Sequence, residues 1–162
     1  MLNDEYYMNI AIQEAKKSEK SGDIPIGAVI VCDNKIIAKS HNTKEKKQSV
    51  IGHAEINVIT KANKKIGSYR LDGATLYVTK EPCLMCMGTI LSARIAKVVF
   101  GAKDLRFGTM DLATDNNFNH KCDIVGGVLE TECSNLLTDF FKKLRGNNES
   151  KRKTNSITKE NR

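Results

Sequence analysis

The sequence predicts an α/β fold: a three-layer α/β/α sandwich around a central mixed five-stranded sheet. Short β-branched runs alternate with amphipathic segments along the chain, which is the pattern of a sheet covered by helices on both faces. The length of 162 residues suits one domain with a core of its own. The first two strands are expected to be antiparallel, and the later strands, which are joined through helices, are expected to be parallel.

The N-terminal part of the chain predicts a helix followed by a hairpin. Residues 4–20 carry apolar side chains at helical spacing. Residues 26–32 and 36–40 are β-branched and apolar, and Asp33 and Asn34 between them favour a tight turn. We therefore expect a helix that packs on an antiparallel pair of strands.

The rest of the chain predicts three further helices and three further strands. Proline fits the first position of a helix, so Pro82 marks the start of the middle one. The predicted helices are residues 54–62, 82–93 and 131–145. The predicted strands are residues 75–79, 98–101 and 123–125. We predict a loop over residues 43–52 and irregular structure over residues 103–121.

Positive charge is concentrated at the C-terminal end. The net charge is +7, and residues 142–162 hold eight of the 26 Lys and Arg residues against two Glu. The sequence therefore predicts one domain over residues 1–146 and a basic, disordered tail over residues 147–162. A basic extension favours a polyanionic partner, most simply nucleic acid, although a solvated tail without any partner has the same composition.

Segment lengths and cysteine usage argue against several classes of protein. The longest apolar stretch, residues 24–32, is too short to cross a bilayer. The amphipathic N-terminus lacks the basic start and apolar core of a secretory signal, so we expect a cytoplasmic protein without a membrane partner. Five Cys residues with one Cys-x-x-Cys pair favour metal or redox chemistry over disulfides.

Two short motifs carry the chemistry: His53-x-Glu55 and Pro-Cys83-x-x-Cys86. Each lies at the start of a predicted helix, where the helix dipole favours the thiolate that zinc needs. His53, Cys83 and Cys86 supply three protein ligands, which leaves the fourth tetrahedral position of a catalytic Zn²⁺ open for water. The pair of motifs, in this order, is the signature of zinc deaminases.

Glu55 lies beside the predicted ligands without being needed as one of them. A carboxylate there can take a proton from the zinc-activated water and deliver it to a ring nitrogen and to the leaving amine. The predicted reaction is therefore hydrolytic deamination, in which a zinc-bound hydroxide attacks an amidine carbon and ammonia leaves.

Each part of this pattern also has a plainer interpretation. A Cys-x-x-Cys pair can be a redox motif or half of a structural zinc site, and a lone His is commonly a packed or surface residue. The chain holds no second Cys-x-x-Cys pair, and no thioredoxin-like βαβ segment precedes the first. The conjunction favours catalytic zinc, and we interpret the isolated Cys32, Cys122 and Cys133 as packing residues.

Beyond these motifs, the sequence closely resembles the bacterial tRNA-specific adenosine deaminases of the cytidine-deaminase superfamily, over about residues 4–145. The resemblance is carried by residues 23–29, 41–42, 53–55, 75–86, 92–102, 118–120 and 139–141. It implies a cytidine-deaminase-like fold and conversion of adenosine to inosine at the wobble position, within the anticodon stem-loop of tRNA. It also implies a homodimer in which both subunits contribute to RNA binding.

The resemblance further implies residues that bind the substrate. Asn42 is similar to a pocket asparagine that hydrogen-bonds the nucleoside, and Ile26 is similar to an apolar wall of the base pocket. A turn cap explains Asn42 as well, and a core position explains Ile26 equally. Ala54 and Asp104 also match substrate-binding positions, whereas residues 105–111 depart from the small-residue loop that is usual in the family.

The predicted C-terminal helix ends in a basic turn. Its apolar face is expected to dock on the domain, so that Lys142, Lys143 and Arg145 point outward and bind RNA phosphates. The tail that follows is expected to contribute less, because ordering it costs entropy. The alternative is that both regions only solvate the surface.

Two other functions remain compatible with the sequence. One is a deaminase of a free base or nucleoside, such as cytosine, cytidine or guanine. The other is a non-catalytic RNA-binding partner subunit that keeps the fold. The basic C-terminal end and the length of the resemblance favour tRNA as the substrate, and the retained Glu55 argues against a subunit without catalysis.

Overall fold

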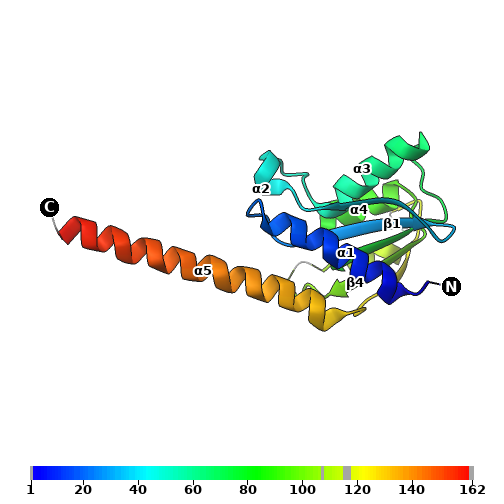
Figure 1. Cartoon of the computed structure of the whole chain (residues 1–162). Coiled ribbons are helices and arrows are strands. Elements are labelled where there is room, and N and C mark those ends of the chain that lie inside the picture. Colours follow the sequence, from blue (N-terminus) through cyan, green and yellow to red (C-terminus); the bar gives the residue numbers. More distant parts are fainter. Residues whose placement is uncertain (1, 107, 115–117, 161–162) are drawn as a thin grey trace.

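A mixed sheet of five strands lies between two layers of helices, which confirms the predicted fold class (Figure 1). The computed structural model describes residues 2–106, 108–114 and 118–160. The strands, in the sheet order β2-β1-β3-β4-β5, are β1 (Gly27–Cys32), β2 (Lys35–His41), β3 (Thr75–Lys80), β4 (Lys97–Ala102) and β5 (Asp123–Val125). The helices are α1 (Asp4–Glu19), α2 (Lys44–Lys47), α3 (Ala54–Ile66), α4 (Leu84–Ser92) and α5 (Glu130–Glu160), with a 3₁₀ helix η1 (Met110–Thr114).

The strand directions bring three chain segments to one edge of the sheet. β1 pairs antiparallel with β2 and with β3, whereas β3, β4 and β5 run parallel, as predicted. Asp33 and Asn34 turn the hairpin with φ of 49° and 59°, the left-handed conformation that suits the twist of the two strands. Because β1 opposes β3, the amino end of β1 lies beside the carboxyl ends of β3 and β4.

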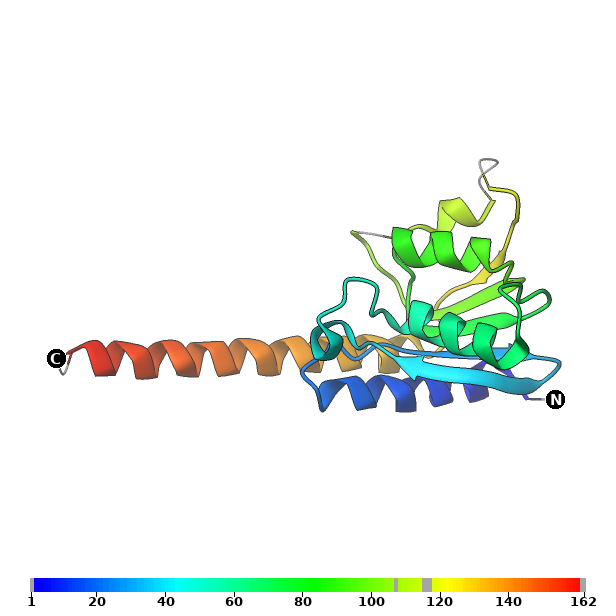
Figure 2. The ribbon, with the colours of Figure 1, turned by 90° about the horizontal axis from the view of Figure 1, so that it is seen from above.

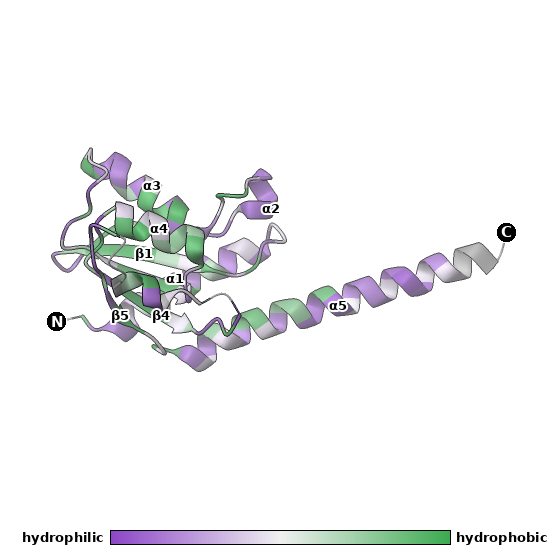
Figure 3. Ribbon diagram, turned by 180° about the vertical axis from the view of Figure 1, so that it is seen from behind, coloured by the Kyte–Doolittle hydropathy of each residue, from purple (hydrophilic) through white to green (hydrophobic). Residues whose placement is uncertain are grey.

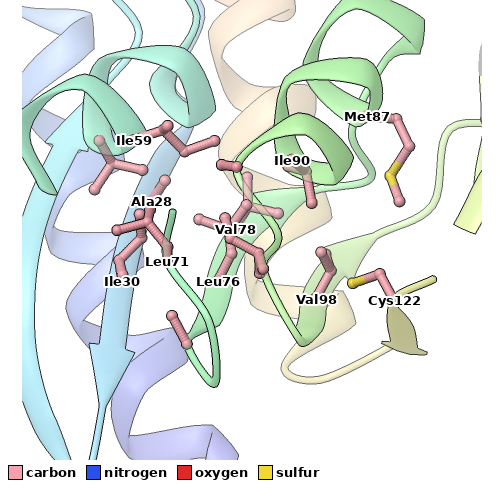
Figure 4. Close-up of a cluster of buried hydrophobic side chains, with 14 of the residues drawn as sticks. Ala28, Ile30, Ile59, Leu71, Leu76, Val78, Met87, Ile90, Val98 and Cys122 are labelled. Atoms are coloured by element: carbon pink, nitrogen blue, oxygen red, sulfur yellow. The ribbon is translucent and has the colours of Figure 1, made fainter. Parts of the chain in front are cut away.

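Helices cover both faces of the sheet (Figures 1 and 2). α3 and α4 pack on one face over a core that includes Ile30, Val78 and Ile90 (Figure 4), and α1 and the first turns of α5 pack on the other. α1 lies so close to β1 that a Cβ atom at Gly27 would overlap the carbonyl oxygen of Ala11. Only glycine fits this contact, which fixes where β1 begins.

Two segments predicted as loop or irregular structure contain short helices, so those predictions were wrong in part. α2 forms inside residues 43–52 because the Asp23 carboxylate, distant in sequence, accepts hydrogen bonds from the N–H groups of Glu45 (2.5 Å) and Lys46 (3.2 Å). η1 lies inside residues 103–121. Within residues 105–111, the loop that differs from the family pattern, Phe107 lies outside the described residues.

The largest difference from the sequence prediction concerns α5. The helix was expected to end at Arg145 and to be followed by a disordered tail, but it continues through Gly146 to Glu160, and Figure 1 shows it projecting away from the domain. Extending a helix that is already nucleated costs far less than starting one, and a single glycine costs only about 1 kcal/mol. Residues 161–162 lie outside the described part of the chain.

Candidate active site

The first turns of α3 and α4 meet at the edge where β3 ends, and they bring His53, Cys83 and Cys86 together. His53 and Cys83 are the N-cap residues of α3 and α4, and Cys86 lies in the first turn of α4. Nδ1 of His53 lies 3.6 Å from Sγ of Cys83 and 3.4 Å from Sγ of Cys86. α4 begins at Leu84, two residues later than predicted, so Cys83 keeps an extended backbone (φ −78°, ψ 175°).

This arrangement fits a metal ion. The three ligand atoms lie within 4.8 Å of one another, and each comes from a different side chain. One imidazole nitrogen and two sulfurs form a soft donor set, and three protein ligands leave one tetrahedral position for a further ligand. The sequence predicted these three residues as ligands, and the structure places them together.

The electrostatics of the two thiols also suit a cation. Hydrogen bonds from Cys86 and His53 lower the pKa of Cys83 to about 3. The pKa of Cys86 is raised, mainly by its hydrogen bond with Cys83 and secondly by burial. The pKa of His53 is also raised, mainly by its hydrogen bond with Cys83. The three side chains thus share protons around one thiolate, and a metal ion would take the place of these protons.

Glu55 is buried in the first turn of α3, next to this cluster. The residue is 4% exposed, and its carboxyl group and the thiol of Cys86 influence the pKa of one another. Burial raises the pKa of this carboxyl group above its usual value, because the charged form loses water. A carboxyl group with a raised pKa accepts a proton more readily than an exposed one, which suits a group that transfers protons.

Ile26 and Asn42 lie at the same edge of the sheet. The N–H of Asn42 donates to the carbonyl of Ile26 (2.9 Å), and the N–H of Gly27 donates to Oγ1 of Thr79 at the end of β3 (3.2 Å). Ile26 is partly buried against the core on the α3 and α4 face. Both residues are therefore close to the end of β3 from which the chain enters α4.

The side chain of Asn42 is held within its own loop. Its Nδ2 atom donates to the carbonyl of Ile24 (3.2 Å), and its Oδ1 atom accepts from the N–H of Lys44 (3.2 Å). These are the bonds of a turn residue, and they fix the amide in one orientation with 5% of the residue exposed. The structure thus shows a rigidly placed amide at the edge of the site.

Ala54 and Asp104 take different places. Ala54 is the first residue of α3 and is fully buried in the core below the cluster. Asp104 follows β4, where it pairs with Lys80 (3.0 Å) and accepts from the N–H of Arg106 (3.0 Å). The N–H of Asp104 donates to Glu81 (2.7 Å). The loop after β4 is thereby tied to the loop that carries Cys83.

The three cations predicted to bind RNA lie apart from this cluster. Lys142, Lys143 and Arg145 are exposed on α5, which covers the opposite face of the sheet. Arg145 nevertheless shares a cleft of about 380 Å³ with Arg106, which lies in the loop after β4. The basic turn of α5 therefore borders the edge of the sheet that carries the cluster.

Sequence reasoning missed a second basic surface. A cleft of about 540 Å³ beside Gly52, the residue before His53, is lined by four lysines from α2 and α3: Lys46, Lys47, Lys61 and Lys64. The sequence carried two signals for it, the basic composition of residues 43–52 and the spacing of Lys61 and Lys64 by about one helical turn. The role of Asp23 in capping α2 also left no local signal, because its partners are far along the chain.

Comparison with known proteins shows what the chain is similar to. Residues 2–145 match the MafB19-like deaminase family. A tRNA-specific adenosine deaminase of Bacillus subtilis (strain 168) is 50% identical over 157 residues, which cover 94% of this chain and 98% of that protein. A protein of the same name from Aquifex aeolicus (strain VF5) is 38% identical over 150 residues, 90% of this chain and 99% of that protein.

Two solved structures extend the comparison. One comes from studies of A-to-I editing by tRNA:A34 deaminases at the wobble position of transfer RNA. Its TM-score with this chain is 0.79 at 38% sequence identity, and the match covers 82% of this chain and 99% of the other. The other is a guanine deaminase of Bacillus subtilis, with a TM-score of 0.60 at 39% identity, covering 63% of this chain and 66% of that chain. Both similarities include the fold described above.

Proposed function

Because the chain belongs to the MafB19-like deaminases and, among them, to the tRNA-specific adenosine deaminases, we propose that it converts adenosine to inosine at the wobble position of tRNA anticodons. The observation that carries the proposal is the cluster of His53, Cys83 and Cys86 with the buried Glu55 against it. A structural metal site needs no buried acid beside it, whereas a hydrolytic site needs a group that moves protons.

The ion that fits the cluster is Zn²⁺. His53, Cys83 and Cys86 would hold it through one nitrogen and two sulfurs, a donor set that zinc accepts readily. When bound there, Zn²⁺ would supply an activated water as the nucleophile and lower the pKa of that water to about 7. The ligands come from the N-termini of two helices, so the ion would also join α3 to α4.

Glu55 moves the protons. Its carboxylate accepts a proton from the attacking water and delivers it to N1 of the adenine ring; a further transfer to the exocyclic amine lets ammonia leave. The carbon–nitrogen bond to the amine breaks, a carbon–oxygen bond from water forms, and the products are inosine and ammonia. The raised pKa of Glu55 suits this role, since the group must be protonated in one step and ionised in another.

The residues around the cluster would position the nucleotide. We assign to Asn42 a hydrogen bond to the nucleoside, to Ile26 the apolar side of the base pocket, to Ala54 a supporting place behind that pocket at the start of α3, and to Asp104 a contact with the RNA through its loop. Lys142, Lys143 and Arg145 would bind phosphates of the anticodon stem-loop. These assignments rest on the position of each residue at, or bordering, the edge of the sheet where β3 ends.

A homodimer and a cytoplasmic location complete the proposal. Several large apolar side chains near the site and on the outer ends of α3 and α4 are exposed: Val50, Ile51, Ile66, Tyr69 and Leu84. A second copy of the chain would cover such side chains.

None of the helices in the described part of the chain combines the length and the apolar composition needed to cross a bilayer.

The alternative substrate is a free base or nucleoside, since a guanine deaminase shares part of the fold. The tRNA-specific relatives match nearly the full length of the chain, which favours tRNA. Incubation of the zinc-loaded protein with tRNA, and separately with guanine, cytosine, cytidine and adenosine, tests the choice. Inosine in the tRNA with the small molecules unchanged supports the proposal, and ammonia released only from a free base or nucleoside refutes it.

A further inference from the structure

The outer part of α5 forms an arm that leaves the domain. We define the arm as residues 146–160 of α5. Figures 1 and 2 show it extending away from the sheet as a continuous helix, and every residue from 146 to 156 is exposed. A helix rises 1.5 Å per residue, so the arm reaches roughly 20 Å beyond the domain.

The composition of the arm excludes an apolar partner. The arm has one apolar residue, Ile157. It holds four cations, Lys151, Arg152, Lys153 and Lys159, against the two carboxylates of Glu149 and Glu160. In Figure 3 the colour changes along α5 from mixed green and purple near the sheet to purple farther out. A coiled coil or a membrane-bound helix needs an apolar stripe, and this segment has none. A polyanion is the partner that matches the charge.

The arm starts at the end of the domain that carries the active site. On one side, Phe140 and Asn147 share a cleft with Gly22, which lies just before the amino end of β1. On the other side, Phe141 and Arg145 share a cleft with Arg106, in the loop after β4. Figures 1 and 2 agree that the arm emerges at the same end as α2.

We propose that the arm binds the phosphate backbone of the helical stem of the RNA whose loop occupies the active site; this rests on the proposed function. The arm projects from the end of the domain at which the loop would be held, so it is placed beside a stem that leaves the domain on that side. Contacts to phosphates are independent of sequence, so a basic helix can follow the stem of any accepted RNA. Because the arm is already helical, binding pays little for ordering the backbone.

The test compares two substrates. One is a whole tRNA with adenosine at the wobble position; the other is the same anticodon loop closed by a shortened stem. The variant K151Q/R152Q/K153Q removes three cations of the arm. The matched control K16Q/K35Q/K65Q removes three exposed lysines from α1, the hairpin and the end of α3.

We expect the arm variant to raise KM for the whole tRNA about tenfold, to flatten the salt dependence of tRNA binding and to leave kcat within about twofold. KM for the short-stem RNA stays at the wild-type value, and the lysine control changes neither. An unchanged KM for the whole tRNA, or an equal rise for both RNAs, overturns the proposal.

Gly146 offers a second test that leaves every charge in place. A Cβ atom at this position meets nothing within 4 Å, so Gly146→Ala keeps the helix, whereas Gly146→Pro kinks or breaks it. We expect only the proline variant to raise KM for the whole tRNA, with equal zinc content in both. Equal KM values for the two variants would show that the direction of the arm does not matter and would refute the proposal.

These outcomes separate the arm from the proposed function. If the wild-type protein deaminates neither RNA, the proposed function fails. The salt dependence of tRNA binding by the wild-type protein and the arm variant still decides the role of the arm, since it needs no turnover. Identical slopes for the two proteins would overturn it.

Discussion

Nδ1 of His53 lies 3.4 Å from Sγ of Cys86, although the two residues are 33 positions apart in the chain. Together with the contact of His53 with Cys83, this contact joins the N-terminal ends of α3 and α4, which pack side by side on one face of the sheet. A metal ion held by these residues therefore contributes to the stability of the domain as well as to its chemistry.

Loss of a thiol ligand should remove the metal and weaken the fold. Cys86→Ser leaves two protein ligands and a hydroxyl that zinc binds poorly, so metal content falls well below one ion per chain. We expect the melting temperature to fall by about 5 °C or more, given about 2–4 °C per kcal/mol in a chain of this size. Cys32→Ser is the control, because Cys32 lies outside the cluster. A Cys86→Ser protein that keeps one zinc per chain would contradict the ligand assignment.

Glu55→Gln should separate proton transfer from metal binding. The amide keeps the shape of the side chain but cannot carry the proton, so kcat should fall at least about 10²–10⁴-fold, the usual contribution of a general acid–base group. Zinc content and melting temperature stay near those of the wild type. Glu132→Gln, an exposed residue of α5, serves as the control and keeps full activity. Activity of Glu55→Gln within about tenfold of the wild type would rule out the assigned role.

A buried carboxylate on α1 should make stability depend on pH. Burial opposes the ionisation of Glu14, but hydrogen bonds from Lys17 (2.8 Å) and His41 (3.2 Å) outweigh it and lower the pKa of Glu14 below its ordinary value of 4.5. A lowered pKa in the folded state stabilises the protein above the unfolded-state pKa, and this stabilisation is lost as the pH falls through the folded-state pKa.

Glu14→Gln tests this link between α1 and β2. At pH 7 we expect the variant to lose about 1–3 kcal/mol of unfolding free energy, because hydrogen bonds to a charged group are replaced by weaker ones. The difference from the wild type should shrink as the pH falls below the ordinary value of 4.5 and through the lowered pKa of Glu14 in the folded state, where the carboxylate takes up its proton. Denaturant unfolding at pH 7 and at lower pH measures both values, and a difference that stays constant over this range would contradict the account.

The basic turn of α5 should bind RNA without taking part in the chemistry. Replacing Lys142, Lys143 and Arg145 by alanine should raise KM for tRNA and leave kcat little changed. Each lost phosphate contact lowers the slope of log binding constant against log salt by about 0.7–0.9. The exposed lysines at 16, 35 and 65 again provide the control. A slope equal to that of the wild type would mean that these cations do not touch phosphate.

The sequence predicted the parts of the fold that depend on local pattern. The β-branched strands, the hairpin turn at Asp33 and Asn34 and the cluster of His53, Cys83 and Cys86 all follow from short motifs with fixed spacing. The parallel order of β3, β4 and β5 followed from the helices that connect them.

The elements that were missed depend on contacts between distant segments or on helix propagation. α2 is capped by Asp23 from another loop, and no local signal marks it. The length of α5 was underestimated because Gly146 and a polar composition suggested an end, whereas a helix anchored on the sheet can extend through both. The cleft lined by Lys61 and Lys64 could not be predicted, because it is formed jointly with residues of α2, whose position was unknown.

An isotope experiment distinguishes hydrolytic deamination of the wobble adenosine from every other outcome. The zinc-loaded protein is incubated in H₂¹⁸O with a tRNA that carries adenosine at the wobble position, and the nucleosides are then analysed by mass spectrometry. We expect inosine at that position alone, carrying one ¹⁸O atom on the purine ring, and at least about 100-fold slower formation of it with Glu55→Gln. Unchanged adenosine, inosine at other positions, or inosine without the isotope would contradict hydrolytic deamination of the wobble adenosine at this site.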